Sequence, residues 1–320
     1  MCAASQQKEA ENIVNLLSGH YTSVSVIIAT YNRDESLCSA ISSVLAQEYP
    51  GKMQLIVVDQ SPGHSEEVAA FLHEHEKEMR YLRLAEPNLP RARNVGIAEA
   101  AGELILFVDD DIVLPRDAVS RLASHFQPQG CRAVAGLVLS ERHPEITLKR
   151  YAREYGRRVL SPNRNLIGVR HFIGALMCVP AETVRLVGGF DEKLGRLTPT
   201  ACSEDDDFCC RLHEAQVRLF LDPSIRVMHR DHAAGGCQAR KIDPELAARY
   251  HMLALAYMLL KQHGYIGLIG WGRMLSGYVV NRMNLKIGVK HVLKRFSVAR
   301  RAVAEARGFA AVEGVGPSRR

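Results

Sequence analysis

Short apolar runs alternate with amphipathic segments along the first half of the chain. Four runs are almost wholly apolar and have the length of buried strands: 24–29, 53–58, 103–108 and 132–139. Between the first two, apolar residues recur at helical spacing at Leu37, Ala40, Ile41, Val44 and Leu45. Strands that alternate with helices predict βαβ units, and therefore a parallel sheet with right-handed crossovers.

The same two patterns, apolar runs of strand length and apolar residues at helical spacing, predict the remaining elements. We expect further helices over 65–79, 90–100, 116–126, 181–187 and from Ser203, which is placed as a helix N-cap. We expect further strands over 81–84, 168–179, 217–221 and 225–228. Asp34 is the expected N-cap of the first long helix. Residues 141–165 are rich in Arg, Pro and Asn and are expected to form a loop or lid.

The pattern changes near residue 244. A long helical pattern covers 244–262, an apolar stretch follows over 265–280, and 281–307 is helical and basic. From Lys241 onward there are 14 Lys and Arg against 4 Asp and Glu, although the whole chain carries only +6. This asymmetry predicts that the tail meets an anionic surface. Charged residues interrupt every apolar run, which favours helices lying on a membrane over helices crossing it; the alternative is that they pack on the rest of the protein.

Composition narrows the class of protein. The chain has 320 residues, of which 47% are apolar and 24% charged, as in a soluble globular protein of one large or two smaller domains. Its eight cysteines show no regular spacing, which indicates reduced thiols. A zinc site is disfavoured because no CxxC or HxxxH spacing supports it; its ligands would come from Cys202, Cys209, Cys210 and Cys237 with His213, His229 and His232. The N-terminus carries acids and lacks an apolar core, so we expect no signal peptide there.

Three adjacent carboxylates follow the third of the apolar runs. Asp109, Asp110 and Asp111 repel one another at the end of a buried strand, where α/β sheets bind their ligands. Mg²⁺ and similar hard cations take such oxygen ligands together with substrate phosphates. The alternative is a solvated acidic turn before the helix near Pro115, because acids are favourable at helix N-termini. The triple Asp alone does not decide between them.

Several segments together resemble the family 2 glycosyltransferases of the GT-A fold. In order along residues 22–232 they are VSVIIATYNR, LIVVDQS, ARNVGIAEAAGELILFVDDD, GGFDE, SEDDDFCCRL and a late strand ending in His229. The resemblance implies an α/β domain with a mostly parallel Rossmann-like sheet. It also implies sugar transfer from a nucleotide diphosphate sugar to an acceptor hydroxyl, with inversion.

The resemblance assigns roles residue by residue. Asp109 and Asp111 fall on the DxD motif that holds a divalent metal, Mn²⁺ or Mg²⁺, against the diphosphate. His229 falls on a position that is a third metal ligand in some relatives; otherwise a His at a strand end is structural, and His232 is a neighbouring competitor. Asp205 falls on the general base, and Glu204 precedes it. The remaining expected contacts with the nucleotide sugar come from Thr30, Asp59, Gln60, Arg93 and Asp110.

Two positions depart from the family pattern. The family more often has a second Asp where Gln60 stands, and that Asp accepts a hydrogen bond from uracil; an amide oxygen can still accept, but uridine specificity does not follow. Pro180 stands near a position that is often basic in the family. For Arg93, a solvent-facing helix arginine is the structural alternative.

Other functions are disfavoured by particular features. A sugar-nucleotidyltransferase needs a glycine-rich loop after the first strand, and Ala29–Arg33 contains no glycine. A sugar-nucleotide fold that has lost catalysis and serves as a membrane scaffold usually lacks one of the catalytic carboxylates. Here Asp109, Asp111 and Asp205 are all present. Nucleic-acid binding is disfavoured because the basic tail lacks interleaved aromatics.

The predicted organisation has three parts. They are an N-terminal extension (1–21), a GT-A catalytic domain (22–240) and a basic helical C-terminal region (241–320). We expect a cytoplasmic enzyme docked on the inner membrane face, with a glycan or lipid-linked saccharide as acceptor. The sequence leaves open the donor sugar, its base, the acceptor and the oligomeric state.

Overall fold

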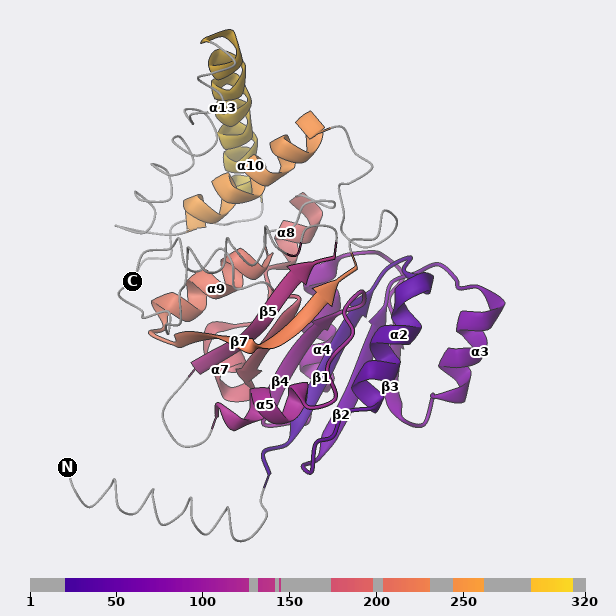
Figure 1. Ribbon diagram of the computed structural model, residues 1–320. Coiled ribbons are helices and arrows are strands. Elements are labelled where there is room, and N and C mark those ends of the chain that lie inside the picture. Colours follow the sequence, from indigo (N-terminus) through magenta and orange to yellow (C-terminus); the bar gives the residue numbers. More distant parts are fainter. Residues whose placement is uncertain are drawn as a thin grey trace, which may run out of the picture. The chain divides into compact units, whose positions relative to one another are not determined.

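The computed structural model describes residues 21–126, 132–141, 144, 174–197, 204–230, 244–261 and 289–312 (Figure 1). The chain divides into two compact units, each of which is described by itself. Unit 1 comprises 1–190 and 208–236, and unit 2 comprises 191–207 and 237–320. The residues of several predictions lie outside the described ones: the N-terminal extension (1–20), most of the 141–165 loop, Cys202, Ser203, His232, Cys237 and 265–280.

Unit 1 is built on a mixed seven-stranded sheet in the order β3-β2-β1-β4-β6-β5-β7. The strands are β1 (Val24–Thr30), β2 (Met53–Asp59), β3 (Met79–Arg83), β4 (Leu104–Asp109), β5 (Arg132–Ser140), β6 (Leu176–Pro180) and β7 (Arg218–His229). Strands β3, β2, β1 and β4 run parallel, and so do β5 and β7. Strand β6 is antiparallel to both β4 and β5. The predicted mostly parallel α/β sheet is therefore confirmed.

Helices cover both faces of this sheet (Figure 1). They are α2 (Asp34–Leu45), α3 (Glu66–Glu74), α4 (Leu89–Glu99), α5 (Ala118–Ser124), α7 (Ala181–Val187) and α9 (Glu204–Glu214), whose first four residues belong to unit 2. Leu37 of α2 and Leu122 of α5 share one buried cluster with Val26 and Ile28. Ile27 points to the opposite face, where a Cβ on Gly96 of α4 would lie 2.5 Å from its Cγ2. Alternation along β1 thus buries the strand on both faces, as its unbroken apolar run predicts.

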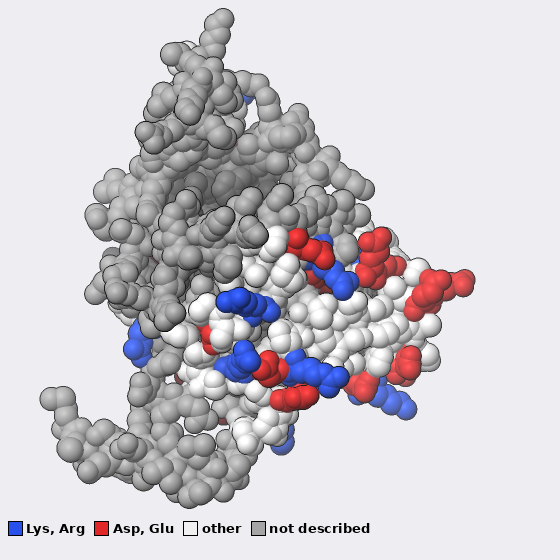
Figure 2. Space-filling model, viewed as in Figure 1, with Lys and Arg blue, Asp and Glu red and all other residues white. Residues whose placement is uncertain are grey.

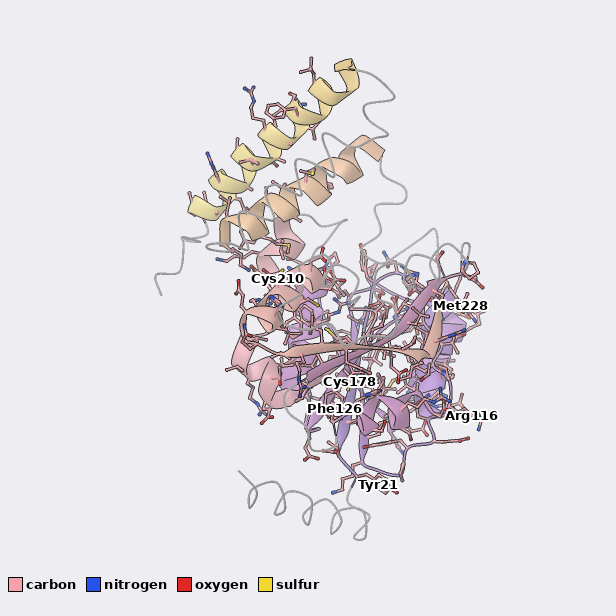
Figure 3. The ribbon with its side chains drawn as sticks, turned by 60° about the vertical axis from the view of Figure 1, so that its left-hand side comes forward. Tyr21, Arg116, Phe126, Cys178, Cys210 and Met228 are labelled. Atoms are coloured by element: carbon pink, nitrogen blue, oxygen red, sulfur yellow. The ribbon has the colours of Figure 1, made fainter. Side chains whose placement is uncertain are left out.

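The two edges of the sheet are distinct. Tyr21 lies at the edge where the parallel strands begin, and Met228 lies near the carboxyl end of β7 (Figure 3). Because β7 runs in the same direction as β4, its last residue and Asp109 belong to the same edge. Figure 2 shows acidic and basic side chains interspersed over the described surface of this face of unit 1.

Unit 2 contains α8 (Glu192–Leu197), the first turn of α9, α10 (Pro244–Lys261) and α13 (Val289–Val312). Helix α13 buries a stripe of small residues, namely Ala299, Ala302, Ala306 and Ala310. It packs along α10, and the ring of Tyr257 meets that of Phe309 edge to face at 5.6 Å. Alanines at three- and four-residue spacing allow close approach of two helices.

Several local expectations were wrong. The helix predicted over 65–79 ends at Glu74, and β3 already begins at Met79. Strands 217–221 and 225–228 are one continuous strand, whose pairing with β5 shifts between Gly136 and Leu137. Arg33, not Asp34, is the N-cap of α2; Asp34 lies inside the helix, and its side chain is engaged elsewhere.

A helix lying on a membrane would expose an apolar face, and the sequence predicts such a face over 252–260, but most of the described side chains there are buried. Met252, Leu253, Tyr257 and Met258 are all at most 4% exposed. These side chains are core residues, since helix α10 packs against α13 and α8. Among the described residues, no helix is long and apolar enough to cross a membrane.

Candidate active site

The carboxyl ends of four strands bring the predicted site residues of unit 1 to one edge of the sheet. Thr30 pairs with Asp59 across β1 and β2, while Ala29 pairs with Asp109 across β1 and β4. His229 ends β7 at the same edge. Each side chain sits where an apolar strand gives way to a polar turn, so burial of the preceding strand fixes its position.

Asp109, Asp111 and His229 form a compact cluster at this edge. One ligand atom from each lies within 4.8 Å of the other two. Backbone contacts hold the two halves together, because Ile112 bridges to His229 and the Arg230 N–H donates to the Asp111 carbonyl at 3.2 Å. Residues more than a hundred positions apart in the sequence are thereby fixed against each other by backbone pairing.

Arg33 supplies a buried positive charge beside these acids. Its Nη1 donates to Oδ2 of Asp111 at 2.5 Å and lies 3.9 Å from Oδ1 of Asp110. The guanidinium side chain is only 4% exposed. Burial of an unpaired carboxylate is costly, so Arg33 stabilises the acidic turn after β4.

Asp109 has its own cationic partner. Nη2 of Arg93 donates to Oδ1 of Asp109 at 3.0 Å, and the Arg93 guanidinium lies 5.1 Å from the ring centroid of Phe190. Arg93 is 4% exposed, so the alternative of a solvent-facing helix arginine is excluded. The acidic turn after β4 is therefore flanked by two cations, Arg33 and Arg93.

Asp110, the middle residue of the turn, is also buried, at 6% exposed. Burial raises the pKa of its carboxyl to about 7, although the nearby charge of Arg33 acts in the opposite direction. The carboxylate of Asp111 adds to the increase. Loss of hydration on burial is the main physical cause, and the like charge of Asp111 is a smaller one.

The three clustered side chains fit a divalent cation. Among the residues the structure describes, Oδ1 of Asp111 is buried and accepts no hydrogen bond of normal geometry, although Nε2 of His229 lies 3.3 Å away. Two carboxylates with one imidazole are a donor set suited to Mn²⁺ or Mg²⁺. A cation would use the lone pairs that the protein leaves unsatisfied.

Hydrogen bonds within the chain fix the two residues at the end of β2, Asp59 and Gln60. The carboxylate of Asp59 accepts from Ser61 N–H at 2.8 Å and from the Tyr81 hydroxyl. Gln60 is 4% exposed; its amide donates to the Thr30 carbonyl at 3.3 Å and accepts from Asn88 N–H at 2.5 Å. The nitrogen and the oxygen of this side-chain amide thus join the end of β1 to Asn88, next to the predicted nucleoside contact.

His64 connects Asp59 to helix α2. Its Nε2 lies 2.7 Å from Oδ2 of Asp59, and its Nδ1 lies 2.6 Å from Oδ1 of Asp34. Burial alone would lower the pKa of His64, but hydrogen bonds to the two carboxylates outweigh it and raise the pKa. Burial would raise the pKa of both acids, but hydrogen bonds lower it. For Asp34 the contact with His64 contributes most, and for Asp59 the bonds from Tyr81 and Ser61 contribute more than the one with His64.

The GGFDE segment begins in unit 1. Asn94 of α4 donates to the Phe190 carbonyl at 2.8 Å and accepts from Phe190 N–H at 2.7 Å. Gly188 has a φ of 77°, which favours glycine, and a Cβ on Gly189 would lie 2.3 Å from Oδ1 of Asn94. Both glycines are therefore required for this turn against α4.

Glu204 and Asp205 lie in unit 2, at the start of α9. Glu204 is buried and Asp205 is half-buried, with Oδ1 accepting from Asp206 N–H at 2.9 Å. Four consecutive acids, Glu204–Asp207, occupy the first helical turn, where the helix dipole favours negative charge. The predicted base is thus on a helix N-terminus, outside the unit that holds the Asp109–Asp111–His229 cluster.

Sequence reasoning missed four residues that organise these sites. Arg33, His64 and Tyr81 support the acids of unit 1, and Lys261 contacts the acids of unit 2. Only Arg33 carried a signal, since it follows β1 directly, and β1 lies beside the strand that ends in the triple Asp. The other three depend on tertiary contacts.

The fold is of the GT-A type, as two solved structures show. The S. aureus TarS fragment 1–349, solved in complex with UDP-GlcNAc, matches with a TM-score of 0.64 at 15% identity, over 88% of this chain and 81% of that chain. The mannosyltransferase PcManGT from Pyrobaculum calidifontis, solved with GDP-Man and Mn²⁺, has a TM-score of 0.58 at 15% identity, over 99% and 86%. These likenesses confirm the predicted fold.

Residues 25–181 match the glycosyl transferase family 2 model. An N-acetylglucosaminyltransferase of Mesorhizobium japonicum is 31% identical over 163 residues, covering 49% of this chain and 38% of the relative. One of Rhizobium meliloti is 28% identical over 217 residues, covering 64% and 50%. The chain thus spans half or less of the length of these curated relatives.

Proposed function

We propose that this protein transfers a sugar, with inversion, from a nucleotide diphosphate sugar to an acceptor hydroxyl of a glycan or lipid-linked saccharide. The observation that carries the proposal is the convergence of Asp109, Asp111 and His229 at the carboxyl edge of a family 2 domain. The catalytic region is proposed to span 22–240, with 241–320 as its helical extension.

Donor binding is assigned to the edge of unit 1. Asp109, Asp111 and His229 would hold Mn²⁺ or Mg²⁺, which when bound stabilises the negative charge that develops on the leaving diphosphate. Arg93 is placed beside Asp109 to contact the same anion. Thr30, Asp59, Gln60 and Asp110 shape the nucleoside side, the last three through buried contacts within the chain.

Proton removal from the acceptor is assigned to Asp205. An inverting displacement needs a carboxylate that takes the hydroxyl proton while the hydroxyl oxygen attacks the anomeric carbon. Glu204 supports the same helical turn. Because Gln60 is held by Thr30 and Asn88, the base of the nucleotide is not predicted from this position.

A donor screen tests the proposal. UDP-GlcNAc is the first donor to test, because the curated relatives are N-acetylglucosaminyltransferases. UDP-glucose, GDP-mannose and dTDP-glucose complete the screen, with nucleoside diphosphate release measured with Mn²⁺ or with EDTA. We expect Mn²⁺-dependent release from one donor, increased by the correct acceptor. Release from none of the donors, together with no thermal stabilisation by any of them, would contradict the function.

A sugar-nucleotidyltransferase is the alternative that the same screen addresses. Such an enzyme would form pyrophosphate from a nucleoside triphosphate and a sugar phosphate. Residues Ala29–Arg33, at the end of β1 and directly after it, contain no glycine, so a phosphate loop of that type is not expected. A protein that binds a donor with no turnover would instead be a catalytically inactive scaffold.

A further inference from the structure

A charged cluster in unit 2 joins three segments that are far apart in the sequence. Nζ of Lys261, at the end of α10, donates to Oδ2 of Asp191 at 2.5 Å and to Oδ1 of Asp207 at 2.9 Å. Asp191 belongs to the GGFDE segment, and Asp207 closes the first turn of α9. One ammonium group therefore bridges two carboxylates.

The cluster is mostly shielded from water. The side chains of Asp207, Asp191 and Lys261 are 2%, 14% and 22% exposed. Hydrogen bonds to charged partners are short and strong, and they are weakly screened at such exposures. A buried carboxylate that loses its cation is costly, so Lys261 holds both acids in place.

Asp191 is fixed by further contacts. Its Oδ2 accepts from the Tyr257 hydroxyl at 3.2 Å, and its Oδ1 accepts from Lys193 N–H at 3.0 Å. Burial by itself would raise the pKa of Asp191, but the charge and hydrogen bond of Lys261 outweigh it and lower the pKa. Asp191 is therefore an ionised anchor for Lys261.

We propose that Lys261 is a positioning residue for Asp205, because it fastens Asp207, and with it the first turn of α9, to Asp191. Asp205 is two residues from Asp207 in that turn, so holding Asp207 fixes the backbone from which Asp205 projects. The positive charge also offsets part of the repulsion among the four acids at 204–207. This inference rests on the proposed role of Asp205 as base.

This proposal gives the C-terminal helix α10 a role in the reaction. Helix α10 contributes a charged side chain to the acceptor-side acids, in addition to the apolar residues it packs against α13. A truncation before residue 244 would remove Lys261, so the family 2 segment 25–181 would not carry this arrangement by itself.

The test compares Lys261→Met and Lys261→Arg with the wild type. We expect Lys261→Met to lower kcat at least tenfold while donor KM changes less than twofold, since the donor cluster lies in unit 1. Loss of the cation disfavours an ionised base, so the acidic limb of the kcat–pH profile should move to higher pH. Lys261→Arg keeps the charge and should recover most of kcat and the original limb.

Matched controls separate this role from general effects of charge or stability. Arg116→Met removes an exposed positive charge of unit 1, outside both proposed sites, and should leave kcat and its pH profile unchanged. If Lys261→Met does not fold, Asp191→Asn, which removes one of the two carboxylates on Lys261, should lower kcat with donor KM unchanged. Wild-type kcat in a folded Lys261→Met or Asp191→Asn variant would overturn the proposal.

The same assays separate this inference from the proposed function. Loss of kcat in Asp205→Asn together with normal kcat in Lys261→Met keeps the base and rejects the positioning role. Normal kcat in both variants rejects the base itself. A lower kcat in Lys261→Met with an unmoved acidic limb indicates a structural role alone and also rejects the proposal.

Discussion

Nη1 of Arg33 lies 2.5 Å from Oδ2 of Asp111, and both side chains are almost fully buried. The contact joins the N-cap of α2 to the turn after β4. Oδ1, the other oxygen of Asp111, lies on the side of His229. Arg33 therefore pairs with one oxygen of this carboxylate, and the other oxygen faces His229.

Replacement of Arg33 should destabilise the protein strongly. In Arg33→Met, Asp111 and Asp110 would keep their burial and lose their nearest cation. Removing one partner of a buried ion pair costs about 3–5 kcal/mol. We expect the free energy of unfolding to fall by this order in urea titrations with EDTA, and Mn²⁺ to restore part of it by binding the folded state.

Arg116 offers the matched control. Its Nη1 lies 3.4 Å from Oε1 of Glu48, and the two side chains are 76% and 66% exposed. Surface pairs of this kind contribute about 0–1 kcal/mol, so Arg116→Met should be close to the wild type. Equal stabilities of the two variants would show that Arg33 does not compensate the buried acids.

Removal of a carboxylate from the cluster should abolish the metal response. Asp111→Asn keeps the size of the side chain and the contact with Arg33 is weakened, but the charge that would hold a cation is lost. We expect a folded protein that shows no Mn²⁺-dependent thermal shift with the donor and little transfer. Undiminished transfer by the wild type in excess EDTA would contradict a metal role for Asp109, Asp111 and His229.

Much of the fold could be predicted because burial leaves a direct mark in the sequence. The apolar runs of β1, β2 and β4 are buried on both faces, and their lengths agree with the observed strands to within a residue or two. The pattern failed where a local signal had a tertiary cause. Asp34 has the residue type of an N-cap, but His64 and Ser65 take its carboxylate.

The residues of the candidate site that lie at the ends of strands could be predicted from the sequence. Asp109 and Asp111 follow one buried strand and His229 ends another, so sheet topology is enough to bring them together. The role of Lys261 could not be predicted in this way. The sequence of α10 shows only a helical pattern in which charged residues interrupt an apolar run. The role of Lys261 depends on how α10 meets Asp191 and Asp207, and a periodic pattern does not carry that information.

Asp205 should affect turnover without affecting donor binding. In Asp205→Asn the amide cannot accept the acceptor proton, so we expect kcat to fall by about 10²–10⁴-fold. Donor affinity should remain unchanged in a Mn²⁺-dependent thermal shift, because Asp205 is expected to face the acceptor. Near-normal turnover in this variant would transfer the role of base to another acid, with Glu204, Asp206 and Asp191 as the candidates.

The contribution of His64 to stability should depend on pH. Its pKa is raised in the folded protein, so its contribution is fully present below the unfolded value of about 6.5 and is lost as pH rises through the folded pKa. The stability difference between the wild type and His64→Gln should therefore be largest near pH 6 and diminish toward alkaline pH. Urea titrations across this range measure it.

His73 provides the control for that experiment. It meets Glu76 at 3.1 Å on the surface, where its side chain is 82% exposed. His73→Gln should change stability little and with no comparable dependence on pH, because an exposed pair is screened by solvent. A difference for His64→Gln that grows above pH 7 would contradict the ion pairs with Asp34 and Asp59.

Helix α13 carries the described part of the proposed membrane contact. Leu293 and Phe296 are exposed, as are Arg300 and Arg301, while the alanine stripe of the helix is buried. Basic residues gain about 1 kcal/mol each near an anionic leaflet, and exposed apolar side chains add burial in the headgroup region. We therefore expect flotation with vesicles containing phosphatidylserine at low salt, and much less with phosphatidylcholine alone.

Charge reversal on α13 tests whether this helix makes the contact. Arg300→Glu/Arg301→Glu should lose flotation with anionic vesicles, whereas Arg80→Glu/Arg116→Glu changes net charge equally on exposed residues of unit 1 and should keep it. Salt at about 0.5 M should weaken binding of the wild type, because it screens surface charge. Absence of the wild type from both kinds of vesicle at low salt would leave the basic helices a structural role and favour an acceptor that is not held in a membrane.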